Sequence, residues 1–289
     1  MGADRPSPVV QRRRLRTELR KARHEVGLTQ EQVADAMDWS LSKVIRIEAG
    51  TVGISTTDLK ALLSYYQVGD PDLINELVAL ARAARERSWW SVYRDVAPPG
   101  VLQLIGYEAA SYIIRNFETL LIPGLLQTED YARAVVPSLE EGATAERVDT
   151  LVEIRMRRQE QVDRDDPPLM FFILDEAAVR RLVGSRDVMR RQIHYLSEMA
   201  AKPNITIEIV PFTAGTHPGL RGPFVIIEFA DPGDDDVLYL EARGDLIRGG
   251  ISEEGDVSAY REVFEQLRRL SLGPDGSIAY LRKLTDEMT

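Results

Sequence analysis

Several polar side chains lie at or near the start of a helix predicted over Leu41–Glu48. Ser40 and Ser42 stand at its N-terminal end, where hydroxyls and free backbone amides can bind a phosphate or the edge of a base. Lys43 and Arg46 are long enough to donate hydrogen bonds to O6 and N7 of guanine in the major groove. Side chains of these types at this spacing are therefore suited to contacts with duplex DNA.

The apolar pattern predicts a bundle of about five helices, of which this helix is the third. The apolar stripe of the first consists of Leu15, Leu19, Ala22 and Val26. Thr29 and Gln32 form a capping box that starts the second helix, and Ser40 can cap the third. The third helix is expected to bury Leu41, Val44 and Ile47. A fourth helix is predicted from about Ser55, and a fifth over Pro71–Ser88.

Two short helices joined by a tight turn within an all-helical unit make a helix-turn-helix, whose second helix enters the major groove. Residues Gly27–Gly50, GLTQEQVADAMDWSLSKVIRIEAG, closely resemble the Xre and phage-repressor class of helix-turn-helix. The resemblance rests on the Thr-Gln opening, the central alanine and the final Ile-Glu-x-Gly. The alternative is a four- or five-helix bundle that shares only the helix lengths.

The resemblance implies that Leu41–Glu48 is the recognition helix of a lambda-repressor-like domain. Its outward residues are then Ser42, Lys43, Ile45 and Arg46. Arg46 is the leading base reader. The family usually has a small polar residue where Ile45 stands, so Ile45 either faces a thymine methyl group or belongs to the core. Gln30 matches the family glutamine that contacts the DNA backbone and braces the recognition helix.

Charged residues on and before the first predicted helix extend this interpretation. Arg23 and Glu48 match an arginine and a glutamate that pair beneath the recognition helix in related repressors. The alternative is two solvated surface charges. Arg12, Arg13 and Arg14 precede the expected helical stripe and are candidates for contacts to phosphates or to the minor groove. A solvated charge run is the alternative for these three.

Charge is unevenly distributed along the 289 residues, whose net charge is −10. Residues 1–66 carry 11 Lys and Arg against 8 Asp and Glu, whereas residues 101–289 carry 21 against 33. The basic part is expected to bind a double-stranded DNA operator, and the acidic part to bind other partners. One recognition helix reads few base pairs, so a homodimer is expected. The predicted helices Glu253–Leu272 and Ser277–Met288 are candidates for its contact.

The pattern changes at Ala97-Pro98-Pro99-Gly100, where the two prolines disfavour a continuing helix. We therefore predict a helix-turn-helix domain over 1–88, a linker over 89–100 and an α+β domain over 101–289. Strands are predicted at Leu169–Leu174, Ile205–Val210, Phe224–Phe229 and Val237–Leu240. Further helices are predicted at Glu129–Val136, Ala145–Arg164 and Asp187–Met199. The order of the strands cannot be read from the sequence.

The second domain resembles an actinobacterial regulator family in the order and spacing of its motifs. These motifs include IPGLLQT at 122–128, YAR at 131–133, LDEA at 174–177 and GTHPG at 215–219. Members carry an Xre-type domain before a C-terminal domain described as antitoxin-like, and are commonly encoded beside a small partner protein. The resemblance implies a transcriptional regulator that binds this partner. The alternative is a small-molecule effector, which an apolar pocket with convergent polar groups would favour.

The sequence argues against an enzyme, a metal site or a bound cofactor. The absence of Cys excludes thiol catalysis and cysteine-ligated zinc, and His24, His194 and His217 lack the H-E-x-x-H spacing. No nucleophile elbow, P-loop or dinucleotide fingerprint is present. His217 and Arg221 could cradle an anion, and the acidic run 231–236 could hold a cation, but ordinary loops explain both segments better. Without a signal peptide or membrane span, a cytoplasmic location is expected.

Overall fold

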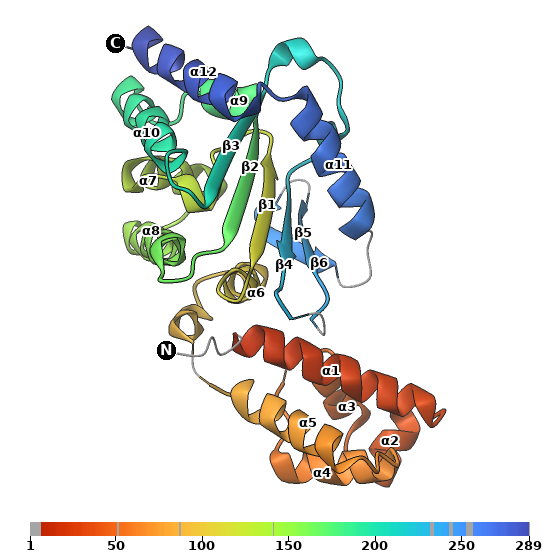
Figure 1. The fold of residues 1–289 in the computed structure, drawn as a ribbon. Coiled ribbons are helices and arrows are strands. Elements are labelled where there is room, and N and C mark those ends of the chain that lie inside the picture. Colours follow the sequence, from red (N-terminus) through yellow and green to blue (C-terminus); the bar gives the residue numbers. More distant parts are fainter. Residues whose placement is uncertain are drawn as a thin grey trace. The chain divides into compact units, whose positions relative to one another are not determined.

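The computed structural model describes residues 7–50, 52–86, 88–140, 142–231, 234–242, 245–252 and 257–288. The chain divides into two compact units, Met1–Ser91 and Val92–Thr289. The first unit is all-helical, and the second combines helices with a mixed sheet (Figure 1). This confirms the predicted fold class, an all-α helix-turn-helix domain followed by an α+β domain.

Five helices are found in the described part of the first unit. They are α1 (Pro8–Glu25), α2 (Gln30–Ala36), α3 (Leu41–Glu48), α4 (Thr56–Tyr65) and α5 (Pro71–Ala83). The predicted capping box opens α2: the Thr29 amide donates to Gln32 Oε1 at 2.8 Å, and the Gln32 amide donates to Thr29 Oγ1 at 3.2 Å. Ser40 Oγ accepts the Lys43 amide and caps α3. These local bonds place the turn between α2 and α3 where the sequence predicts it.

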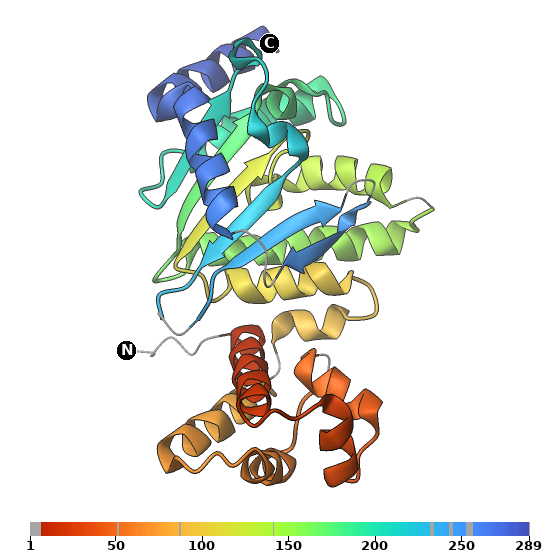
Figure 2. The ribbon, with the colours of Figure 1, turned by 90° about the vertical axis from the view of Figure 1, so that its right-hand side faces the viewer.

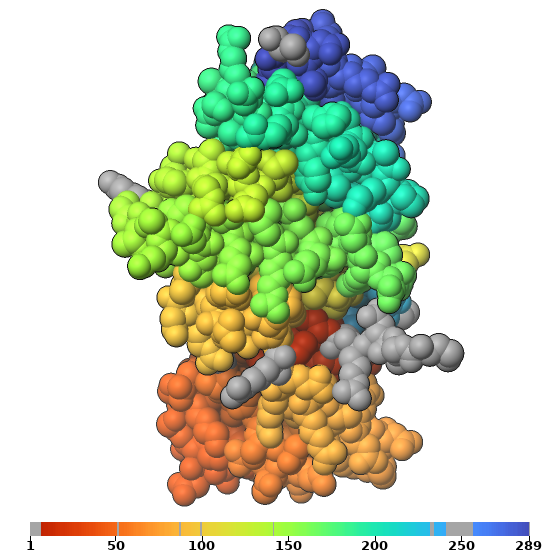
Figure 3. Space-filling model, turned by 90° about the vertical axis from the view of Figure 1, so that its left-hand side faces the viewer, coloured from red at the N-terminus to blue at the C-terminus, as the bar shows by residue number. Residues whose placement is uncertain are grey.

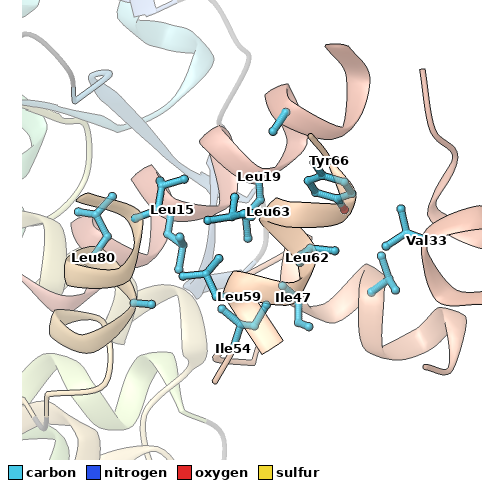
Figure 4. Close-up of a cluster of buried hydrophobic side chains, with 14 of the residues drawn as sticks. Leu15, Leu19, Val33, Ile47, Ile54, Leu59, Leu62, Leu63, Tyr66 and Leu80 are labelled. Carbon is cyan, nitrogen blue, oxygen red and sulfur yellow. The ribbon is translucent and has the colours of Figure 1, made fainter. Parts of the chain in front are cut away.

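The apolar stripes of these helices meet in one core (Figure 4). Its most deeply buried members include Leu19, Val33, Leu59, Leu63 and Leu77. From α3, Val44 and Ile47 are buried as predicted, but Leu41 is 37% exposed. The prediction that Leu41 faces the core is therefore wrong, because the packed stripe of α3 begins only at Val44.

The first helix begins earlier than predicted. Pro8 occupies its first turn, where the missing N–H breaks no helical hydrogen bond, and Ser7 Oγ accepts the Val9 amide as the cap. Arg12, Arg13 and Arg14 therefore lie inside α1. The expectation that they precede the first helix is corrected.

The described part of the second unit is built on a six-stranded sheet of order β3-β2-β1-β4-β5-β6. The strands are β1 (Ile113–Glu118), β2 (Leu169–Asp175), β3 (Ile205–Val210), β4 (Phe224–Glu228), β5 (Val237–Ala242) and β6 (Asp245–Ser252). The first three are parallel, and β4, β5 and β6 are each antiparallel to the preceding neighbour in the sheet. Parallel neighbours need long crossovers, which is why helices separate β1, β2 and β3 along the chain.

Helices cover both faces of this sheet. They are α6 (Pro99–Glu108), α7 (Glu129–Leu139), α8 (Ala145–Gln159), α9 (Glu176–Arg180), α10 (Arg186–Met199), α11 (Val257–Leu270) and α12 (Gly273–Glu287). Figure 2 shows α11 lying across one face, where Phe264 and Leu267 pack against Phe117, Phe224 and Ile226. The opposite face is covered by α7, α8 and α10, whose outer surface is seen in Figure 3.

The sequence pattern finds four of the strands, as β2 to β5, and does not predict β1, because Arg115 and Asn116 interrupt its apolar run. It also does not predict α6, since Pro99 disfavours a continuing helix but is acceptable at the start of a new one. The segment 89–100, expected as a linker, contains the 3-10 helix η1 (Trp89–Tyr93) and the start of α6. The helix predicted from Glu253 is α11, and residues 253–256 lie outside the described residues.

Candidate nucleic-acid interface

The side of α3 that faces away from the core carries Ser42, Ile45 and Arg46. Ser40, which caps the helix, is exposed beside them. Ile45 is 44% exposed, so the alternative that it belongs to the core is wrong. The apolar side chain of Ile45 thus lies on a polar surface, next to Arg46 in the chain.

Arg46 lies along the outer surface of α3. Its Nε donates to the backbone carbonyl of Ser42, one turn earlier, at 3.2 Å. This bond joins two exposed groups, and a hydrogen bond at such a position adds little net stability. The side chain is therefore placed where a base edge in a groove could be contacted.

Lys43 is directed toward the start of α4. Its Nζ lies 3.2 Å from Asp58 Oδ2 and 3.7 Å from the centre of the Trp39 ring. Both members of the ion pair are more than one-third exposed at the side chain, so the pair contributes only about 0 to 1 kcal/mol. A phosphate can displace the carboxylate, but Lys43 does not share the outward direction of Arg46 that the sequence predicts.

A buried ion pair supports α3 from below. Arg23 Nε lies 2.7 Å from Glu48 Oε1, and Arg23 Nη2 lies 3.0 Å from Glu48 Oε2. Only 10% and 3% of the two side chains are exposed, so the predicted pairing is present and the solvated alternative is wrong. The hydrogen bonds that Arg23 donates to Glu48 raise the pKa of Arg23, and burial raises the pKa of the neighbouring Tyr66.

Gln30 joins this pair at the beginning of α2. Its Nε2 donates to Glu48 Oε2 at 2.8 Å. The start of α2 and the end of α3 are thus tied to one carboxylate, which is the bracing role that the sequence predicts for Gln30. Its contact with the DNA backbone stays a prediction.

Arginines of α1 hold the helices of this unit together, a role that the sequence analysis misses. Arg12 Nη2 donates to the Ala84 carbonyl at 2.9 Å, and Arg14 Nη2 lies 2.8 Å from Glu76 Oε1. Both contacts tie α1 to α5 or its end. No local sequence pattern predicts these contacts, because the partners of Arg12 and Arg14 are 72 and 62 positions away in the chain. The phosphate contacts expected of Arg12, Arg13 and Arg14 remain a prediction.

The second unit contains a pocket of about 630 Å³ beside the end of β1. Apolar side chains of α6, α7 and α8 line it together with Glu118, Gln127 and Arg155. The sequence does not reveal this pocket, because its walls come from segments more than one hundred residues apart.

The two loops considered as ion sites have other contacts. His217 is buried and its Nε2 lies 3.3 Å from Asp175 Oδ2, at the end of β2. Gly219 is required by close packing, because a Cβ there would lie 2.4 Å from the Phe117 ring. In the acidic run 231–236, Asp236 pairs with Arg261, and residues 232–233 lie outside the described residues. The described residues contain no group of acidic or histidine side chains arranged to hold a metal ion.

Two family models match the chain, one within each compact unit. A helix-turn-helix domain matches residues 14–77. Among the described helices, none has the length and apolarity to cross a bilayer. No curated protein and no solved structure matches the chain. The first unit thus makes the chain a DNA-binding regulator of the helix-turn-helix class. A second model, Domain of unknown function (DUF5753), matches residues 101–283, more than half of the chain, and the chain therefore belongs to that family.

Proposed function

We propose that this chain is an Xre-type transcriptional regulator that reads its operator through the outward face of α3. The observation that carries the proposal is the combination of exposed Ser42, Ile45 and Arg46 with a buried anchor, Arg23 and Glu48, under the same helix. Base readers must be held rigidly to discriminate between sequences. Arg46 donates to guanine and Ile45 contacts a thymine methyl group.

The residues around this face make the remaining contacts to the duplex. Ser40 uses its O–H as a donor to phosphate while its Oγ keeps capping α3. Lys43 exchanges Asp58 for a phosphate, and Gln30 reaches the backbone from the start of α2. Contacts of this kind position the protein without reading sequence.

Arg46→Ala tests the proposal. On an operator selected from random duplexes, the variant should lose about 1 to 3 kcal/mol of binding free energy, because a base contact is removed. Binding to random DNA should weaken much less, since phosphate contacts dominate there. Titrations of both DNAs at one fixed salt concentration measure the difference.

Lys21→Ala is the matched control, because it removes one exposed cation from α1 and leaves α3 intact. It should change the two affinities by similar small factors. Equal losses on operator and random DNA in Arg46→Ala would show that Arg46 contacts only phosphate.

We further propose that the chain acts as a homodimer through the second unit. Related helix-turn-helix proteins bind half-sites about one turn apart, and the acidic second unit is better suited than the first to a contact away from phosphate. Leu270 and Leu272, at the junction of α11 and α12, are 38% and 39% exposed. The full chain should sediment as a dimer, and the variant Leu270→Asp with Leu272→Asp as a monomer. A dimeric variant would place the contact elsewhere.

The regulatory ligand of the second unit is proposed to be a small partner protein, as the resemblance to antitoxin-like actinobacterial regulators implies. Phe212 and Leu182, after β3 and after α9, are 58% and 61% exposed and offer apolar contact area. The second candidate is a small-molecule effector, favoured by the pocket beside β1. Either ligand would share a coupling free energy of about 1 to 3 kcal/mol with the operator. Such a regulator acts in the cytoplasm, where the chromosome is.

A further inference from the structure

The pocket beside β1 lies where α/β sheets commonly bind ligands. The chain segment Glu118–Ile122, which leaves the carboxyl end of β1, contributes to its wall. At this strand the sheet changes from parallel to antiparallel neighbours, because β1 pairs with β2 on one side and with β4 on the other. The order β3-β2-β1-β4 also reverses beside β1, and crevices at the carboxyl ends of strands beside such a reversal of strand order are common ligand sites in open α/β sheets.

The pocket wall is apolar over much of its area. Val101 and Leu104 of α6, Val136 and Leu139 of α7, and Leu151 and Ile154 of α8 supply this surface. The volume of about 630 Å³ falls within the range of sites that enclose drug-sized molecules. The size and the walls together suit an organic molecule with an apolar body better than an inorganic ion.

Gln127 contributes a buried acceptor to this wall. Its side-chain Nε2 donates to the Ile122 carbonyl at 2.8 Å, and its backbone carbonyl accepts from Gln159 Nε2 at 2.8 Å. Because the Ile122 carbonyl can only accept, the amide nitrogen must face it, and the orientation of the side chain is settled. The residue is 4% exposed, and its Oε1 has no donor among the described residues.

A buried acceptor of this kind ordinarily has a hydrogen-bond partner. The partner must carry an N–H or O–H group, and a molecule in the pocket can supply one because Gln127 lines the pocket and its amide nitrogen is already held by Ile122. Glu118 and Arg155 also line the pocket, so its wall carries side chains of both charges. Arg158, another lining residue, donates from Nε to Glu108 Oε2 at 2.6 Å.

We propose that this pocket binds a small amphipathic organic molecule whose N–H or O–H group donates to Gln127 Oε1 and whose apolar body lies against α6 and α8. Such a molecule would be the small-molecule effector considered above. Only its effect on operator binding rests on the proposed regulatory function.

Anilinonaphthalenesulfonate is a suitable probe, because it combines an aromatic body with one N–H donor and becomes fluorescent in apolar surroundings. Titration of the full chain should give saturable binding of about one dye per chain by calorimetry. Val101→Trp places a large ring in the pocket from a half-buried position of α6, and should weaken binding by about tenfold or more. Gln127→Leu removes the acceptor and should have an effect of similar size.

The matched control is Val92→Trp, which makes the same substitution at a 71% exposed position outside the pocket. It should bind the dye as the unchanged chain does. Circular dichroism and thermal melting identify which pocket variants are folded, and either folded variant is sufficient for the test. Unchanged dye affinity in a folded Val101→Trp or Gln127→Leu protein would overturn the proposal. The Arg46→Ala titration contains no dye, so its failure would be distinguishable from failure here.

Discussion

Replacing Glu48 with Ala should destabilise the first unit by about 3 to 5 kcal/mol. The reason is that the guanidinium of Arg23, 10% exposed at the side chain, would stay buried without its counter-charge. Gln30 would lose its bond to the same carboxylate, which is one of the contacts between α2 and α3. Urea denaturation of the full chain, followed by circular dichroism, would show that the first unit of the variant unfolds at a lower urea concentration than in the unchanged chain.

Two further variants distinguish the cost of an unpaired buried charge from a nonspecific loss of stability. Glu76→Ala breaks the more exposed pair with Arg14 and should cost no more than about 1 kcal/mol. The double variant Arg23→Met with Glu48→Leu removes both charges and should be less destabilised than Glu48→Ala alone, because no buried charge is left unpaired. A Glu48→Ala protein as stable as Glu76→Ala would mean that Arg23 is solvated when its partner is absent.

A loss of similar size, about 3 to 5 kcal/mol, is expected in the second unit for Glu108→Ala. Glu108 is fully buried at the end of α6, and its carboxylate receives Arg158 Nε at 2.6 Å and a second bond from Nη2. The guanidinium packs against Gly124, where a Cβ would lie 3.2 Å from Nη1. Removing the carboxylate takes away the counter-charge of Arg158, whose side chain is only 14% exposed. Urea denaturation of the full chain, followed by circular dichroism, measures the shift in the unfolding transition of the second unit.

Glu108→Gln keeps the shape and two hydrogen-bonding atoms, and should be less destabilising than Glu108→Ala. The surface control is Asp130→Ala, which breaks the pair of Asp130 with Arg191, both of them more than half exposed at the side chain. That variant should leave the denaturation midpoint almost unchanged. A Glu108→Ala protein with the same midpoint as Asp130→Ala would contradict the assignment of Glu108 as a buried anchor.

The helix-turn-helix could be predicted closely because its signals are local. The capping bonds between Thr29 and Gln32 span three residues, and Ser40 bonds to the amide of Lys43. Bonds of this kind depend on neighbours in the chain, so residue types and spacing are enough to locate α2 and α3. Strands β2 to β5 were predictable for a related reason, since β2, β4 and β5 begin with apolar runs of at least four residues and β3 alternates apolar residues with Thr206 and Glu208.

By itself, then, the sequence determined the class of the first unit and the bounds of α3. It also determined that the second unit combines helices with strands, and the family resemblance implied the pairing of Arg23 with Glu48. Only the tertiary structure decided the strand order, the exposure of Leu41 and the diversion of Lys43 to Asp58. It also decided that Glu118 and Gln127 line the same pocket. Each of these depends on contacts between residues distant in the chain, and such contacts are selected by packing and charge compensation in the folded state, which leave no periodic pattern in the sequence.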